Sequence, residues 1–219
     1  KDGKKRVITL NNQFRMHPEL GNLVSKYSYM DEGGLNSPRP ASDFTHNYHN
    51  LKNQYLYWID NKDKNHHSNG SRYNLNEAEL IAKHIKEAIE QGTYHYEPLA
   101  IITFYRAQVD KLKEACIKYG LYDAEGKPVD KLDLSIGTVD AFQGREFKVV
   151  YLATTYSIGE RDMNPFEKCR LNDNNLLCVA LSRQENLLIV VGNKDDYRHE
   201  NAKKYVPSLY EVNRICNGG

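Results

Sequence analysis

Short apolar runs alternate along the chain with segments in which apolar residues recur at helical spacing. The runs expected to form strands lie at 7–10, 55–60, 99–104, 133–139, 148–156 and 186–193. The run at 99–104 is almost wholly apolar, which is typical of a strand buried on both faces. Strands separated by helices favour right-handed β-α-β units. The pattern therefore predicts one α/β domain with a mainly parallel sheet of about five to seven strands and helices on both faces.

Three segments are predicted to be helices. The stretch 77–91 carries four apolar residues at helical spacing, which form one stripe. Asn74 precedes this stretch and Glu77 follows three residues later, the pattern of an N-cap with a capping-box acid. Apolar spacing also predicts helices at 107–119 and 176–183.

Two stretches, 31–54 and 61–74, are polar with little apolar periodicity, and we expect both to be surface loops. Asp31 and Glu32 look like a metal-holding carboxylate pair. However, they follow no buried strand and precede two glycines, so we interpret them as a turn. The His66–His67 pair has no second cluster of ligands nearby in sequence, and we expect no metal site.

Composition narrows the class of protein only slightly. The chain has 219 residues, of which 40% are hydrophobic and 27% charged, as in an ordinary globular domain. A net charge of +1 provides no global basic field, although a local groove can still be basic. No apolar stretch approaches the length of a membrane span. Four scattered cysteines without a Cys-x-x-Cys pair indicate reduced thiols in an intracellular protein.

The sequence lacks the Gly-x-x-x-x-Gly-Lys-Ser/Thr loop that cradles nucleotide phosphates in P-loop enzymes. Gly126-Lys127-Pro128 has the wrong spacing and places proline where a hydroxyl is required. We therefore expect that this chain by itself does not hydrolyse a nucleoside triphosphate.

Three other segments carry candidate chemistry. QFRMHP (13–18) holds Arg15 between a predicted strand and a proline-limited turn, although these residues alone favour a solvated surface arginine. IGTVDAFQGREF (136–147) runs from a strand into Thr138, where a hydroxyl can meet a phosphate, and strand ends facing a cleft are where open α/β sheets place ligands. VALSRQ (179–184) places Arg183 between a short helix and a buried strand, a rigid position suited to an arginine finger.

In order and spacing, these segments resemble motifs IV, V and VI of superfamily 1 helicases of the up-frameshift/senataxin-like branch. SRYNLNEAE (71–79) and IITFYRAQVDKL (101–112) resemble two further family segments that lie between them. The resemblance covers about residues 8–195. It implies that 1–219 is the C-terminal RecA-like domain of a helicase, whose N-terminal ATP-binding RecA-like domain lies outside this chain.

The resemblance also implies site residues, carried over by motif. Residues facing the nucleotide in the cleft between domains would be Gln13, Arg15, Glu146 and Arg183, with Arg15 on the phosphates and Arg183 as the finger. Residues lining the nucleic-acid groove would be Thr103, Tyr105, Thr138 and Val139, and residues coupling groove to cleft would be Gln143 and Gly144. The implied cofactors are ATP and Mg²⁺, held mainly by the N-terminal domain. The implied partner is single-stranded nucleic acid, with DNA and RNA not distinguished.

The chain departs from the family pattern around the finger. Cys178 stands where the family has asparagine, Phe104 replaces a common proline, and Glu185 is close enough in sequence to hold Arg183 in a salt bridge. Two hypotheses follow: an active motor, or a catalytically degenerate helicase-like binding or regulatory module. Retention of Arg15, Arg183 and Glu146 favours the active motor. We expect a cytoplasmic location, or a nuclear one in a eukaryotic cell.

Overall fold

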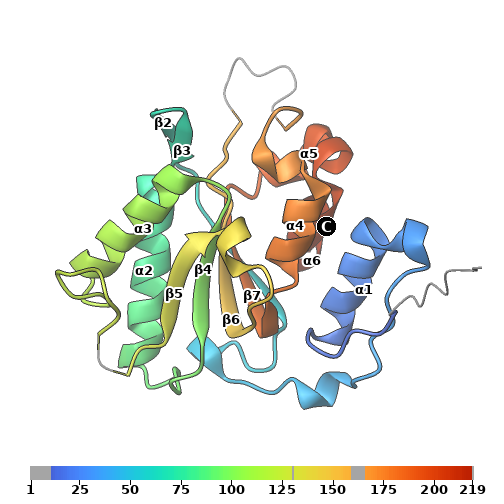
Figure 1. Cartoon of the computed structure of the whole chain (residues 1–219), viewed down its shortest axis with the longest axis horizontal. Helices are drawn as coiled ribbons and strands as arrows, with labels where there is room; N and C mark the ends of the chain where they lie inside the picture. The colour runs from blue at the N-terminus through green and yellow to red at the C-terminus, as the bar shows by residue number, and fades with distance from the viewer. Residues whose placement is uncertain (1–10, 130, 159–165, 219) are drawn as a thin grey trace, which may run out of the picture.

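A five-stranded parallel sheet forms the centre of the domain in the computed structural model, which describes residues 11–129, 131–158 and 166–218. The strand order is β1-β7-β6-β4-β5 (Figure 1). The strands are β1 (Leu56–Asp60), β4 (Leu99–Thr103), β5 (Leu134–Thr138), β6 (Phe147–Ala153) and β7 (Gln184–Gly192). All four pairings between them are parallel. The predicted α/β class and the five strands within these ranges are confirmed, and the predicted strand at 7–10 lies outside the described residues.

Helices cover both faces of this sheet, as predicted. One face is covered by α2 (Leu75–Glu90) and α3 (Arg106–Lys118). The opposite face carries α1 (Pro18–Ser28), α4 (Asn174–Leu181), α5 (Glu200–Tyr205) and α6 (Pro207–Asn217). Figure 1 shows these two layers on either side of the strands. No helix in the described part of the chain is both long and apolar enough to cross a bilayer.

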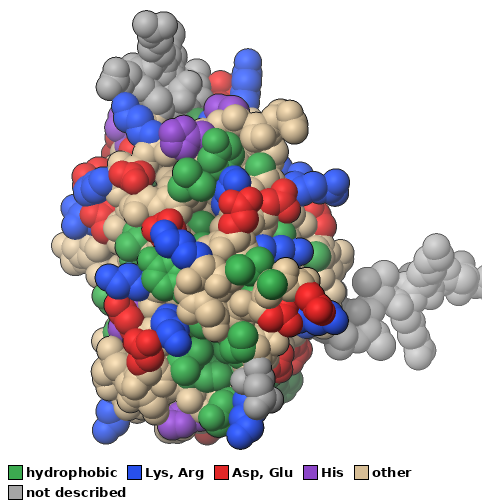
Figure 2. All heavy atoms as spheres, turned by 90° about the vertical axis from the view of Figure 1, so that its left-hand side faces the viewer, with side chains coloured by type: hydrophobic (Ala, Val, Ile, Leu, Met, Phe, Trp, Pro, Cys, Tyr) green, Lys and Arg blue, Asp and Glu red, His purple; other side chains and the backbone are tan. Residues whose placement is uncertain are grey.

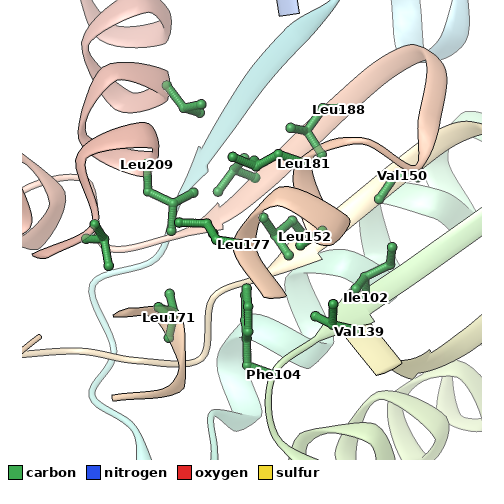
Figure 3. Close-up of a cluster of buried hydrophobic side chains, with 14 of the residues drawn as sticks. Ile102, Phe104, Val139, Val150, Leu152, Leu171, Leu177, Leu181, Leu188 and Leu209 are labelled. Carbon is green, nitrogen blue, oxygen red and sulfur yellow. The ribbon is translucent and has the colours of Figure 1, made fainter. Parts of the chain in front are cut away.

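The core is split by the sheet into two apolar clusters because successive strand residues point to opposite faces. In the central strand β6, Tyr151 belongs to the α2–α3 side and Leu152 to the α4–α6 side. Figure 3 shows the second cluster, in which Leu177 and Leu181 of α4 lie over the sheet. Each fully buried aliphatic side chain of this kind contributes roughly 1.5–3 kcal/mol to folding.

Two segments that we expected to be polar loops contain ordered structure. Within 61–74, β2 (His66–Ser68) and β3 (Ser71–Tyr73) form an antiparallel hairpin, so the loop prediction was wrong. No residue of β2 or β3 is buried, and the pair therefore lacks the apolar alternation that signals a strand.

The stretch 31–54 is largely exposed but is anchored by Phe44 and Tyr48, whose side chains are buried. Asp31 and Glu32 lie in a short 3₁₀ turn that ends at Gly33, with φ of 92°, as the turn interpretation predicted. The helices α1, α5 and α6 were not predicted from the sequence.

Only half of the predicted capping box at α2 exists. The Asn74 side chain accepts a hydrogen bond from the Glu77 backbone N–H at 2.9 Å, which confirms the N-cap. The Glu77 carboxylate does not reciprocate. It accepts the backbone N–H of Thr155 at 2.9 and 3.0 Å, and it also accepts the Thr155 hydroxyl at 3.1 Å. Thr155 has φ of 61°, a region that β-branched residues rarely adopt, so Glu77 stabilises a strained backbone just beyond β6.

Glu77 makes the stability of the fold depend on pH. Burial raises the pKa of this carboxyl from 4.5 to about 8. Between these values the folded chain holds a proton that the unfolded chain has lost, so the free energy of unfolding falls as pH rises through this window. We expect the wild type to lose stability between about pH 5 and about pH 8 relative to Glu77→Gln, measured by urea unfolding at each pH. Parallel pH profiles for the two proteins would contradict a protonated Glu77 in the folded state.

Candidate functional site

Gln13 shapes the turn that presents Arg15. Its side-chain oxygen accepts the backbone N–H groups of Arg15 at 3.1 Å and Met16 at 2.8 Å. Its side-chain nitrogen donates to the Met16 carbonyl at 3.1 Å and to the Ser37 hydroxyl at 2.8 Å. An amide has two donors and two acceptor positions, and all four are therefore used. In this structure Gln13 holds the turn and has no amide group left for the nucleotide contact that the resemblance implied.

Gly21 supports the Arg15 turn by its small size, and sequence reasoning missed it. A Cβ atom there would lie 2.5 Å from the Gln13 side-chain nitrogen and 2.4 Å from the Ser37 hydroxyl. Glycine in a helix interior costs about 1 kcal/mol relative to alanine, and its presence within α1 was the available signal. The glycine leaves space for the Gln13 amide and thereby for the Arg15 turn.

Arg15 joins two segments that are distant in sequence. Its guanidinium donates to the Ser182 carbonyl at 2.9 Å and to the Glu146 carboxylate at 2.5 Å. Its Nε atom is buried and has no hydrogen-bond partner within the described residues. Arg15 and Glu146 line an open pocket of about 410 Å³, whose other lining residues are Asn12, Gln13, Phe14 and Met16.

Arg183 lies against the carboxyl end of α4. Its Nε donates to the Val179 carbonyl at 3.0 Å, and Nη2 donates to the Ser182 hydroxyl at 2.9 Å. The carboxyl end of a helix is the negative end of its dipole, which favours the two guanidinium groups gathered there. Burial, followed by the nearby Arg15 charge, lowers the pKa of Arg183. The expected salt bridge from Glu185 to Arg183 was wrong, since Glu185 pairs with Lys148 instead.

Arg15 and Arg183, together called the arginine cluster, lie at the amino-terminal ends of the parallel strands, which we call the amino-terminal edge of the sheet. The sequence argument had favoured the opposite, carboxyl ends of the strands. Glu146 immediately precedes β6, and the Phe147 backbone N–H donates to the Arg183 carbonyl at 3.0 Å. At the other edge, Thr103 pairs with Thr138 and Ala153. Six residue steps separate Phe147 from Ala153, which corresponds to about 20 Å of strand. The two sets of candidate residues therefore occupy opposite ends of the sheet.

The carboxyl edge holds the residues expected in the nucleic-acid groove, but only some reach the surface. Thr103 is fully buried, and its hydroxyl lies 3.1 Å from that of Thr155. Val139 is buried in the core, where Figure 3 shows it near Ile102. The side chains of these two residues are therefore too deep for direct contact with a strand. Thr138 is half-buried, and Tyr105 lines a pocket of about 380 Å³ at this edge.

One segment, 139–146, connects the two edges. It begins after Thr138 with a short 3₁₀ turn and ends at Glu146 beside Arg15. Gln143 and Gly144, expected to couple groove to cleft, lie exposed within it. Gly144 has φ of 82°, a conformation that glycine adopts without strain.

A five-stranded parallel sheet covered by helices on both faces is the architecture of a RecA-like helicase domain. The chain matches an AAA domain family over residues 1–195 and belongs to that family, the C-terminal RecA-like domain of superfamily 1 helicases of the up-frameshift/senataxin-like branch.

Three curated relatives illustrate this membership. The chain is 26% identical over 200 residues to Helicase sen1 of Schizosaccharomyces pombe, covering 89% of this chain and 11% of the relative. It is 26% identical over 219 residues to the Regulator of nonsense transcripts 1 homolog of Drosophila melanogaster, covering 98% and 18%. It is 33% identical over 124 residues to the DNA polymerase alpha-associated DNA helicase A of Saccharomyces cerevisiae, covering 57% and 16%. The chain thus spans less than a fifth of the length of each of these relatives.

The role of Gly21 is tested by substitution. Gly21→Ala should lower the free energy of unfolding by roughly 1–3 kcal/mol, because the added methyl group displaces the Gln13 amide. In a Gln13→Ala background the same substitution should cost less, since one of the two clashing groups is gone and only the Ser37 hydroxyl remains. Urea unfolding of the two single variants and the double variant measures this difference. Equal costs in both backgrounds would show that the Gln13 amide is not what Gly21 accommodates.

Proposed function

We propose that this chain is the second motor domain of an ATP-dependent DNA or RNA helicase. In this role it completes the ATP site with Arg15, Arg183 and Glu146 and grips single-stranded nucleic acid at its opposite edge. The observation that carries the proposal is the convergence of two guanidinium groups and one carboxylate at a single end of the sheet, where Arg15 comes from a segment more than 100 residues away from the other two.

The cleft residues fit a nucleotide phosphate. Arg15 has a buried Nε without a partner within the described residues, so one of its donors is available for a further acceptor. The Arg15–Glu146 ion pair is partly exposed, with 27% and 50% of the two side chains accessible. Exposed ion pairs contribute only about 0–1 kcal/mol, so a phosphate can displace the Glu146 carboxylate from Arg15 at little cost.

ATP supplies the γ-phosphoryl group that is transferred to water. Arg15 binds phosphate oxygens in the ground state, and Arg183 stabilises the charge that develops on the transferring group. Glu146, the one carboxylate lining the described pocket, is released to face the nucleotide once Arg15 turns to the phosphates. Mg²⁺ needs several oxygen ligands, and we expect these mainly from the N-terminal RecA-like domain.

A second function is a helicase-like regulatory module without turnover. The observation that favours it is the position of Arg183, whose guanidinium donates to Val179, Ser182 and Arg145 and does not line the pocket. A finger that never leaves these acceptors would bind no phosphate. The motor is the better supported reading, because the Arg183 to Arg145 contact is long, at 3.4 Å, and the guanidinium lies beside Arg15.

The purified chain should show no ATPase activity above background, since it carries no phosphate-binding loop of the Walker type. A coupled phosphate-release assay measures this, with single-stranded DNA and RNA each added in turn. Turnover that disappears in the Arg183→Ala variant would show that this domain carries the chemistry alone.

Substitution of Arg183 in the complete helicase separates the two functions. Arg183→Ala should lower kcat by roughly 10³-fold while changing nucleotide affinity much less, because a finger acts mainly in the transition state. Arg183→Lys should rescue poorly, since lysine lacks the planar fork. Steady-state ATPase kinetics and nucleotide titration measure both quantities. An unchanged kcat in Arg183→Ala would establish the regulatory module instead.

A further inference from the structure

A second pocket, of about 380 Å³, opens at the carboxyl edge of the sheet. Three separate parts of the chain form its walls: the β2–β3 hairpin, the turn between β4 and α3, and the segment before α4. The lining residues are His67, Gly70, Ser71, Arg72, Phe104, Tyr105, Arg106, Lys168, Cys169 and Arg170. The pocket therefore has four cationic side chains in its lining and no carboxylate.

This concentration of positive charge is local. Figure 2 shows basic and acidic side chains interspersed over the face that it displays, consistent with a net charge of +1. Within the described part of the chain, Arg72, Arg106 and Lys168 form no ion pair, while Arg170 pairs with Asp140 at 3.2 Å. The Arg72 guanidinium lies 4.8 Å from the centre of the Tyr156 ring, which fixes its position over the pocket wall.

A further feature favours an anion in this pocket. Helix α3 begins here with Tyr105 as its N-cap residue, and no acidic residue lies in its first turn. The positive end of the helix dipole therefore faces the pocket without a carboxylate of its own helix beside it.

A rigid support lies beneath the pocket. Glu77 holds the strained Thr155, and the next residue, Tyr156, carries the ring against which Arg72 packs. The Ser71 hydroxyl accepts the Ala107 backbone N–H at 3.2 Å, which ties the hairpin to the first turn of α3. The cations are thus held on fixed elements.

We propose that this pocket binds a backbone phosphate of single-stranded nucleic acid, with Arg72 and Arg106 as the principal contacts. The proposal rests on the nucleic-acid grip proposed above and assigns it to residues outside the motif threonines. It makes the β2–β3 hairpin, through Arg72, part of the grip. Phosphate recognition by guanidinium groups is independent of base sequence, so the contact should be tolerant of sequence and sensitive to salt.

The test is binding of fluorescently labelled oligo-dT and oligo-U of about 15 nucleotides to the 219-residue chain, a length that covers one typical binding groove. Fluorescence anisotropy at several salt concentrations compares the wild type with Arg72→Ala/Arg106→Ala. The matched control is Lys83→Ala/Lys86→Ala, which removes the same charge from the exposed face of α2. Thermal unfolding of all variants separates binding effects from loss of the fold.

We expect the arginine variant to bind at least about tenfold more weakly at low salt, with a salt dependence shallower by about 1.4 in log–log slope, and the lysine control to match the wild type. If the wild type binds and the arginine variant binds equally well, the pocket assignment is overturned while the proposed function stands. If the wild type binds neither strand at low salt, the proposed grip fails together with the assignment.

Discussion

Burial of the parallel sheet on both faces is the constraint on which the other features depend. Five strands are covered by helices on each side, so polar side chains within the strands have little access to solvent. Thr103 illustrates this, because its hydroxyl is satisfied by Thr155 inside the domain. Chemistry is consequently confined to the two edges of the sheet. The arginine cluster occupies one edge and the basic pocket occupies the other.

Backbone carbonyl groups, more than side-chain partners, assemble the arginine cluster. Arg15 and Arg183 bind carbonyls at the end of α4, and only one carboxylate, Glu146, takes part. Carbonyl groups of a helix end have fixed positions, so they hold long cationic side chains in place. They add no negative charge that would compete with phosphate for the arginines. Glu185, although only two residues from Arg183, has no part in the cluster. It is the second residue of β7, and its charge is paired with Lys148 on the neighbouring strand β6.

The sequence predicted the α/β class, the five central strands and helices at 77–91, 107–119 and 176–183, each within two residues of the observed bounds, because these elements carry strong apolar periodicity. The grouping of Arg15, Glu146 and Arg183 came from motif resemblance, since no local pattern reports which distant segments meet. The exposed β2–β3 hairpin was missed because it buries no apolar face. The burial of Val139 and the saturation of the Gln13 amide depend on tertiary packing, which spacing alone does not encode.

The segment 139–146 joins the two ends of the sheet by two consecutive turns. Its 3₁₀ turn of four residues is followed by a turn that the Arg145 backbone N–H closes on the Phe142 carbonyl at 3.0 Å, with Gly144 at φ of 82°. The backbone between Thr138 and Glu146 is therefore folded on its own hydrogen bonds. A shift of Glu146 first deforms the turn at Gly144 before it reaches the end of β5, so this glycine is the hinge of the connection.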